Sequence, residues 1–271
     1  MTTWTSDLRE ANGIELHYLR TVGAKPPILL LHGLMGSGAC WTPVARALED
    51  EFDVVMPDAR GHGKSGAPLH GYRYDDHARD VIGLIESLGL VSPIVMGHSM
   101  GGMTAAVVAS RISERLRGVV LVDPTFLSPE RQREVCDSDV ADQHRRLLDL
   151  GKDALLAQLR ARHARRSPEL VELLAEARAQ TRMSAFDVLV PPNPAYRGVV
   201  SAIHVPILLA IGDDPVVSPE TARELQRLNP RVRVEQIQGA GHGVPFDQPE
   251  RLVDVVRSFI RSLGSVVQTT S

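Results

Sequence analysis

The sequence has few cysteines, the residues that form disulfides and many structural metal sites. It contains only two cysteines, Cys40 and Cys136, and neither lies at a spacing typical of metal ligands. We therefore expect neither a disulfide framework nor a metal site. A glycine-rich phosphate loop and a dinucleotide fingerprint are also missing from the sequence, so we expect no diffusible cofactor.

A large excess of charge and long apolar runs are missing too. The formal net charge is −3, from 30 basic and 33 acidic residues, which does not indicate a nucleic-acid partner. We interpret the local basic run of Arg160, Arg162, Arg165 and Arg166 as a solvated helix face. The first seven residues do not resemble a secretory signal, and no apolar run is long enough to cross a membrane. We therefore expect a soluble, cytoplasmic chain without a membrane partner, and the sequence leaves its oligomeric state open.

What the sequence does contain is an alternation of strand and helix patterns. The 271 residues, 43% of them hydrophobic, are enough for one α/β domain with an insertion. Continuous apolar runs predict buried parallel strands, and alternating apolar residues predict a half-exposed edge strand at 13–20. The buried strands are expected at 27–31, 53–56, 119–122 and 206–211, with a last strand at 232–237. Helices are expected at 42–48, 75–88, 100–112, 219–228 and 249–263, and a fraying tail at 264–271.

One stretch interrupts this alternation. Residues 129–183 form successive helical patterns with leucines at helical spacing and no strand between them. The stretch falls between two expected core strands, where the loops of an α/β sheet lie over the ends that hold ligands. We therefore expect a helical cap over residues 125–200, with the core formed by residues 1–124 and 201–271.

A short motif gives the first indication of chemistry. Gly97-His98-Ser99-Met100-Gly101 follows the apolar run 93–96 and precedes the small, apolar stretch 102–108. A glycine-flanked serine between a strand and a helix predicts a nucleophile elbow, a tight turn that needs small neighbours and places the serine at a helix N-terminus. Ser99 is therefore the expected catalytic nucleophile.

A serine nucleophile needs a base, and the base needs an acidic partner. His242 lies in the glycine-rich loop 239–243, between the last expected strand and the last expected helix, and is the candidate base. Asp213 and Asp214 follow the strand at 206–211, and either could accept a hydrogen bond from the imidazole. Asp123 is a third candidate, for which we favour a structural role in the turn before Pro124.

The oxyanion formed during acyl transfer needs hydrogen-bond donors. The loop His32-Gly33-Leu34-Met35-Gly36 follows a core strand and brings flexible backbone close to the expected position of Ser99. We expect the donors to be the backbone N–H groups of Leu34 and Met100. The side chains of His32 and Met35 are expected to pack the loop and to form part of a pocket wall.

Together these residues resemble the capped α/β-hydrolase superfamily over essentially the whole chain. The resemblance implies a mostly parallel eight-stranded sheet, a helical cap between strands six and seven, and a Ser-His-Asp triad. It favours Asp214 as the acid, counting back from 215–217, although Gly212 is followed at once by two aspartates where the family commonly has two residues before the acid. The family's turn matches Asp58 to Ser65, where His62 is expected to be structural.

The expected function is therefore that of a serine hydrolase without a cofactor. The substrate we expect is a small molecule, a small to medium acyl or aryl ester or a lactone, with Met35, Trp41 and Phe126 as substrate-binding walls. A serine at the elbow disfavours epoxide hydrolase or dehalogenase chemistry, which in related enzymes depends on an aspartate there. A carbon-carbon bond hydrolase of the ring-cleavage type and a ligand receptor with slow turnover stay open as alternatives. Amide hydrolysis, acyl transfer and perhydrolysis stay open as well.

Overall fold

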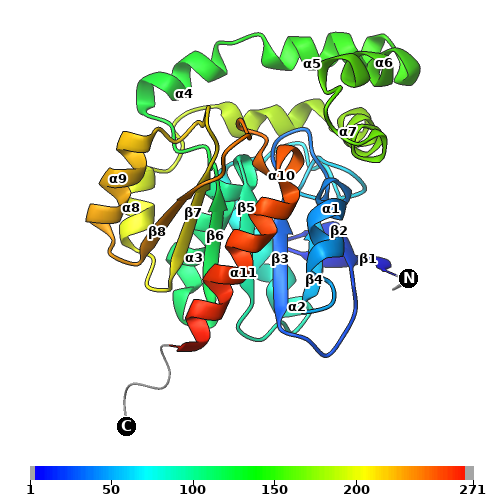
Figure 1. Ribbon diagram of the computed structural model, residues 1–271. Helices are drawn as coiled ribbons and strands as arrows, with labels where there is room; N and C mark the ends of the chain where they lie inside the picture. The colour runs from blue at the N-terminus through cyan, green and yellow to red at the C-terminus, as the bar shows by residue number, and fades with distance from the viewer. Residues whose placement is uncertain (1–3, 266–271) are drawn as a thin grey trace.

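An eight-stranded, mostly parallel sheet forms the centre of the molecule (Figure 1). The computed structural model describes residues 4–265. The strand order is β1-β2-β4-β3-β5-β6-β7-β8, in which β1 and β2 run antiparallel and the strands from β3 to β8 run parallel. The bounds are β1 Thr5–Ala11, β2 Ile14–Arg20, β3 Pro27–Leu31, β4 Asp53–Pro57, β5 Ile94–His98, β6 Gly118–Val122, β7 Ile207–Ile211 and β8 Val232–Gln236. The expected α/β architecture is confirmed.

The edge of the sheet differs from the prediction. The strand expected at the edge, residues 13–20, is β2, and it lies between β4 and β1. The edge strand is β1, which pairs with β2 through a tight Asn12-Gly13 turn in which both residues have positive φ. All residues of β1 except Ala11 are exposed. Because neither face of β1 is buried, its sequence lacks the apolar alternation by which strands are recognised.

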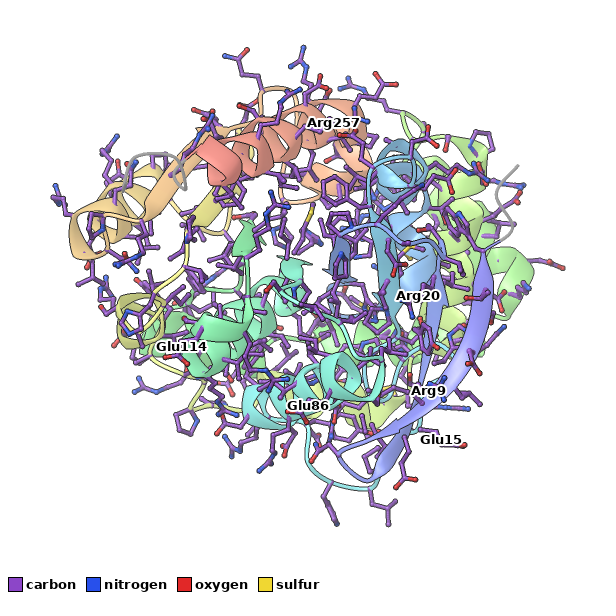
Figure 2. The ribbon with its side chains drawn as sticks, turned by 90° about the horizontal axis from the view of Figure 1, so that it is seen from below. Arg9, Glu15, Arg20, Glu86, Glu114 and Arg257 are labelled. Carbon is purple, nitrogen blue, oxygen red and sulfur yellow. The ribbon has the colours of Figure 1, made fainter. Side chains whose placement is uncertain are left out.

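Helices cover both faces of the sheet. Figure 1 shows α1 and α11 in front of it, and Figure 2 views the same layers from below. The helices on the first face are α1 Thr42–Leu48 and α11 Pro249–Ser265, and those on the second are α2 Tyr74–Ser87, α3 Met100–Ile112, α8 Tyr196–Ser201 and α9 Pro219–Leu228. Shorter turns are η1 Gly38–Trp41, η2 Ser113–Arg115 and α10 Val244–Asp247. The helices predicted at 42–48, 75–88, 100–112, 219–228 and 249–263 are all present.

The two faces of the sheet form two separate apolar clusters. Along β3, Ile28 and Leu30 pack with α1 and α11, whereas Leu29 and Leu31 pack with α2 and α3. Neighbouring residues of a strand point to opposite faces, so covering both faces requires a continuous apolar run. At about 25 cal/mol per Å² of buried apolar surface, these clusters supply the main stabilisation of the fold.

A layer of helices lies over the carboxyl ends of the parallel strands (Figure 1). It consists of α4 Pro129–Cys136, α5 Val140–Asp149, α6 Lys152–Arg162, α7 Pro168–Gln180 and the 3-10 turn η3 Met183–Leu189. Its helices α6 and α7 share a small apolar cluster, formed by Leu155, Leu159, Val171 and Ala175. The range 125–200 also includes most of α8, which packs against the core helices α3 and α9 instead.

Two remaining expectations concern the whole chain. Among residues 4–265, no helix has both the length and the apolar character needed to cross a membrane. Of the tail expected to fray, residues 266–271 lie outside the described residues.

Candidate active site

Ser99 lies in a strained turn between β5 and α3. Its backbone has φ 56° and ψ −118°, a conformation that non-glycine residues rarely adopt. The turn is so tight that a Cβ atom at Gly97 would lie 2.0 Å from the carbonyl oxygen of Gly101, and one at Gly101 would lie 2.2 Å from the carbonyl oxygen of Leu31. The two glycines are therefore a steric requirement of the elbow, and they hold the Ser99 hydroxyl at the start of α3.

His242 stands against this serine. It lies in the loop between β8 and α10, and its Nε2 is 3.0 Å from Oγ of Ser99. Its other ring nitrogen, Nδ1, is 2.5 Å from Oδ2 of Asp123. Since a carboxylate only accepts hydrogen bonds, Nδ1 carries the proton and Nε2 is free to accept the Ser99 proton.

The acidic partner of His242 is therefore Asp123, and the expectation that Asp214 contacts the imidazole is wrong. Asp123 directly follows β6, and its side chain is completely buried. Its two carboxylate oxygens also accept hydrogen bonds from the backbone N–H groups of Val216 and Val217, at 2.9 and 3.0 Å. Asp214 does not line the cavity that holds Ser99 and His242. It lines a separate cavity, together with Tyr74. The loop after β7 thus contributes backbone donors to the acid rather than the acid itself.

Asp213, the other candidate from sequence, fixes the histidine loop. Its carboxylate accepts the backbone N–H of Gly239 at 2.7 Å, and its own backbone N–H donates to the carbonyl of Ala240 at 2.6 Å. The loop and strand approach so closely that a Cβ atom at Gly212 would lie 2.4 Å from the Ala240 carbonyl oxygen. Gly212 and Asp213 are thus explained by docking of the loop that holds His242.

His98 also acts on His242, and the sequence analysis did not single it out. Its Nε2–H donates to the backbone carbonyl of His242 at 2.8 Å, and its ring packs against the imidazole of His242 and the ring of Phe246. Burial, with a further contribution from the nearby His242, lowers the pKa of His98 to about 3, so its ring is neutral at pH 7. Its position between the glycine and the serine of the elbow is the only sequence signal.

Two buried histidines hold the loop after β3. His32 Nε2 accepts the backbone N–H of Ala59 at 2.9 Å, so its Nδ1–H donates to the Gly33 carbonyl at 2.8 Å. His62 Nε2 accepts the N–H of Met35 at 3.3 Å. Burial lowers the pKa of both histidines, which favours the neutral forms that these bonds require.

Two backbone N–H groups near the serine are free to donate, one from this loop and one from the start of α3. A Cβ atom at Gly33 would lie 3.1 Å from the Cβ of Ser99, which shows how closely the loop approaches the elbow. The N–H of the next residue, Leu34, has no hydrogen-bond partner within the described part of the chain. Met100 is the first residue of α3, so its N–H has no partner within the helix.

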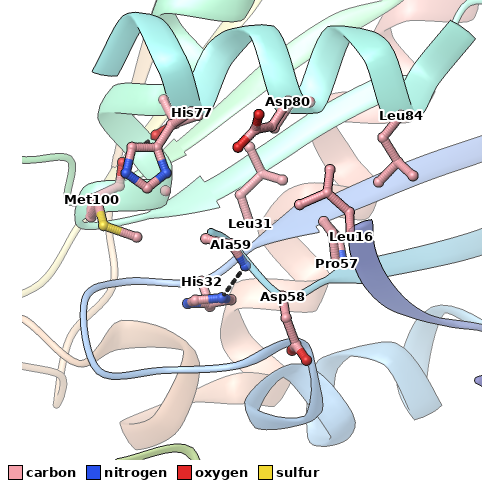
Figure 3. A pocket seen from close by; sticks show the side chains of 13 residues that line it. Leu16, Leu31, His32, Pro57, Asp58, Ala59, His77, Asp80, Leu84 and Met100 are labelled. Atoms are coloured by element: carbon pink, nitrogen blue, oxygen red, sulfur yellow. Dashed lines mark hydrogen bonds between the residues drawn. The ribbon is translucent and has the colours of Figure 1, made fainter. Parts of the chain in front are cut away.

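Behind the loop is a small second cavity of about 30 Å³. In Figure 3, His77 and Asp80 extend from α2 on one side of it, and His32 and Ala59 lie on the other. The Nε2 atom of His77 is buried there without a partner among the described residues. The cavity has room for about one water molecule, so it is too small for a substrate.

A cavity of about 400 Å³ opens above Ser99 and His242. Leu34 and Met35 line it, as expected for Met35. Two other predicted walls are wrong. Trp41 is only 1% exposed and packs in the cluster under α1 and α11, and Phe126 is stacked on Tyr196 within the other core cluster. In a sequence, a buried aromatic residue and a pocket-lining one look the same.

The cap supplies basic side chains to the same cavity. Arg162 and Arg166, together with His163 and Arg178, are among its lining residues. The interpretation of the basic run as a solvated face is therefore wrong for Arg166, which is partly buried, whereas Arg162 is exposed and also lines the cavity. The interpretation is correct for Arg160, which is exposed and pairs with Glu172 across the cap.

The described residues contain no group of three or more histidine, cysteine or acidic side chains that could hold a metal ion. Cys40 is buried and unpaired, and burial raises the pKa of its thiol to about 11. Cys136, at the end of α4, is also unpaired.

The sequence and the fold are both similar to those of known proteins. A family model described as the alpha/beta hydrolase fold matches residues 26–249. The chain is similar to N-formylmaleamate deformylase of Pseudomonas putida, with 31% identity over 88% of this chain and 89% of the relative. It is also similar to 2-(acetamidomethylene)succinate hydrolase of Mesorhizobium japonicum, with 28% identity over 89% and 90% of the two chains. Among solved structures, an esterase from Rhodococcus sp. has a TM-score of 0.79 at 25% identity, covering 97% of this chain and all of the other.

Proposed function

Since the chain belongs to the α/β-hydrolase fold family, we propose that it is a serine hydrolase that cleaves carboxylic esters, lactones included, through an acyl-enzyme on Ser99. The observation that carries this proposal is the continuous hydrogen-bonded chain from Ser99 through His242 to Asp123 at the floor of the cavity. Such a chain converts a weak hydroxyl nucleophile into one that can attack a carbonyl carbon.

The first half of the reaction follows from the protonation states of Ser99, His242 and Asp123. As Ser99 Oγ attacks the carbonyl carbon of the ester, His242 Nε2 takes its proton, and the Asp123 carboxylate stabilises the resulting imidazolium. The negative charge that develops on the carbonyl oxygen is stabilised by the N–H groups of Leu34 and Met100. His242 then protonates the departing alcohol.

The second half of the reaction uses the same groups with water. Water enters the cavity, gives a proton to His242 and attacks the acyl-enzyme, and the imidazolium then returns a proton to Ser99 as the acid leaves. Loss of one oxyanion donor in such sites typically lowers the rate by about 10²- to 10³-fold. The backbone origin of both donors means that no side-chain substitution removes them directly.

A second candidate is cleavage of a non-ester bond by the same three residues. The relative from P. putida is named as a deformylase, which favours an amide substrate over an ester. A carbon-carbon bond next to a carbonyl group is a further variant of this candidate. A panel that pairs each ester with its amide and with a diketone of the same size separates these reactions by their relative kcat/KM values.

Labelling with a fluorophosphonate and turnover of 4-nitrophenyl acetate test the proposal. We expect the label on Ser99, repeated turnover after any burst, and a fall of at least about 10⁴-fold in kcat for Ser99→Ala with an unchanged circular dichroism spectrum. Ser138→Ala, an exposed serine beyond α4, is the matched control and should keep wild-type activity. A Ser99→Ala rate close to wild type contradicts the serine mechanism, and a single burst without turnover favours a receptor.

A further inference from the structure

The cavity above Ser99 is lined by basic side chains and by no acidic one. Three arginines and a histidine of the cap face it, and none of the described lining residues is an aspartate or glutamate. The four basic residues are Arg162 at the end of α6, His163 and Arg166 in the following loop, and Arg178 in α7. Since the chain as a whole has a net charge of −3, this positive lining is a local feature.

Two of these arginines have no counter-ion. Arg166 pairs with Asp247 at 2.8 Å and lies over the ring of Phe246. For Arg162 and Arg178, by contrast, no carboxylate lies within 4.0 Å anywhere in residues 4–265. Arg160, the other arginine of α6 and α7, pairs with Glu172 at 2.9 Å.

The unpaired charges lie close enough to affect each other. Burial, and then the charge of Arg162, lower the pKa of Arg178. Burial, and then the charges of Arg166, Arg162 and Arg178, lower the pKa of His163, so its ring is neutral at pH 7. Arg178 is partly buried and Arg162 is exposed, and two like charges near each other without a counter-ion are unfavourable, so an anion bound between them relieves the repulsion.

We propose, on the basis of the hydrolase function above, that the substrate carries a carboxylate in addition to its scissile acyl group, and that Arg162 and Arg178 bind this carboxylate. A guanidinium presents paired N–H donors in a planar fork that matches the two oxygens of a carboxylate. Because the arginines belong to the cap and Ser99 to the core, one molecule bound to both is held with its acyl carbon at the nucleophile. Arg166, held by Asp247, adds to the positive potential without being free to bind in the same way.

Matched pairs of esters test this proposal. The first pair differs on the acyl side, the mono-4-nitrophenyl ester of glutarate against 4-nitrophenyl valerate. The second differs on the leaving-group side, 4-acetoxybenzoate against its methyl ester. We expect the wild type to favour the charged member of one pair by at least about 10-fold in kcat/KM, and that pair identifies which side of the ester carries the carboxylate.

Substitution of the arginines connects this preference to the cap. Arg178→Gln and Arg162→Gln should each lower kcat/KM for the charged ester about 10- to 100-fold more than for the neutral one, and Lys at either position should restore part of the preference. Arg160→Gln is the matched control on α6, since Arg160 is exposed and does not line the cavity. Its charged-to-neutral ratio should equal that of the wild type.

Binding of glutarate to the Ser99→Ala protein separates this proposal from the function on which it rests. We expect calorimetry to detect binding that weakens at least about 10-fold when Arg178→Gln is added. Ester turnover that depends on Ser99 but shows no charge preference in either pair overturns the carboxylate proposal and leaves the hydrolase. Glutarate binding that depends on Arg178, without turnover that depends on Ser99, overturns the hydrolase and leaves the anion site.

Discussion

Oδ2 of Asp123 lies 2.5 Å from Nδ1 of His242, although 119 positions separate the two residues in the chain. β6, which is directly followed by Asp123, lies next to β5, which leads into Ser99, so the carboxylate and the serine flank the same imidazole. The side chain of Asp123 is fully buried, whereas that of His242 is 40% exposed. Because its two oxygens also accept backbone N–H groups from Val216 and Val217, this carboxylate is held in place beside a ring that becomes cationic during the proposed reaction.

This contact predicts the effect of replacing each candidate acid. Asp123→Asn should lower kcat for ester hydrolysis by about 10³- to 10⁴-fold, because an amide no longer stabilises the imidazolium or selects the required tautomer. Asp214→Asn should change kcat by less than about threefold, because that side chain lines another cavity. Steady-state kinetics on the purified variants, with circular dichroism as a check of folding, measures both. A larger loss of kcat for Asp214→Asn than for Asp123→Asn would identify Asp214, in the loop after β7, as the catalytic acid.

The elbow glycines should tolerate no side chain. Gly97→Ala places a Cβ atom 2.0 Å from the Gly101 carbonyl oxygen, and because that neighbour is backbone, it cannot rotate away. We expect a loss of about 3 kcal/mol or more in unfolding free energy, or failure to fold, with loss of activity in either case. Thermal unfolding and ester turnover report the two effects.

Gly198→Ala provides the control for that prediction. A Cβ atom at Gly198 would contact nothing within 4 Å, and the residue lies within α8. The substitution should raise the unfolding free energy by up to about 1 kcal/mol, since alanine favours helix more than glycine does. Equal stability changes at Gly97 and Gly198 would contradict the steric account of the elbow.

Stability should fall with acidification because of two buried histidines. Burial, followed by the charge of Arg60 for His77 and by His242 for His98, lowers the pKa of each to about 3 from the ordinary 6.5. Between these pH values the unfolded chain binds protons that the folded chain does not. The two histidines therefore make their full contribution to the free energy of unfolding above pH 6.5. As the pH falls towards 3, each loses about 1.4 kcal/mol of this contribution per pH unit.

Urea unfolding between pH 4 and 7 measures this dependence. His77→Gln removes one of the buried histidines with a lowered pKa and should reduce the slope by about 1.4 kcal/mol per pH unit. His70→Gln, at an exposed position, should leave the slope as in the wild type. An unchanged slope for His77→Gln would show that His77 is not the group that takes up a proton on unfolding.

Two residues expected to line the substrate site should behave differently. Met35 lines the cavity, so Met35→Ala should change KM and the preference among acyl chain lengths with little change in melting temperature. Trp41 packs in the core, so Trp41→Ala should lower the unfolding free energy by about 3–5 kcal/mol while KM of the folded protein stays constant. Differential scanning fluorimetry and a series of 4-nitrophenyl esters distinguish the two. A selective change in substrate preference for Trp41→Ala would place its ring at the site.

The parts of the fold and site that could be predicted are those encoded locally. Continuous apolar runs identify strands buried on both faces, and the glycines around Ser99 identify a turn that only small neighbours allow. The place of His242 after the last strand is likewise a matter of chain order. By contrast β1 escaped prediction because it is exposed on both faces and so carries no apolar period.

The identity of the acid and the charge of the pocket were decided only in three dimensions. Local sequence presents Asp123, Asp213 and Asp214 as similar carboxylates at strand ends, and the lateral order of β5, β6 and β7 determines which of them meets His242. The basic run is a similar case, since the packing of the cap over the sheet places Arg162 among the residues that line the cavity and leaves Arg160 outside it. The sequence by itself thus determined the layers, the tight turn at Ser99 and the loop that holds His242, because these depend on neighbours along the chain. The partners of His242 and the polarity of the cavity depend on which distant segments pack together, and only the tertiary structure decides that.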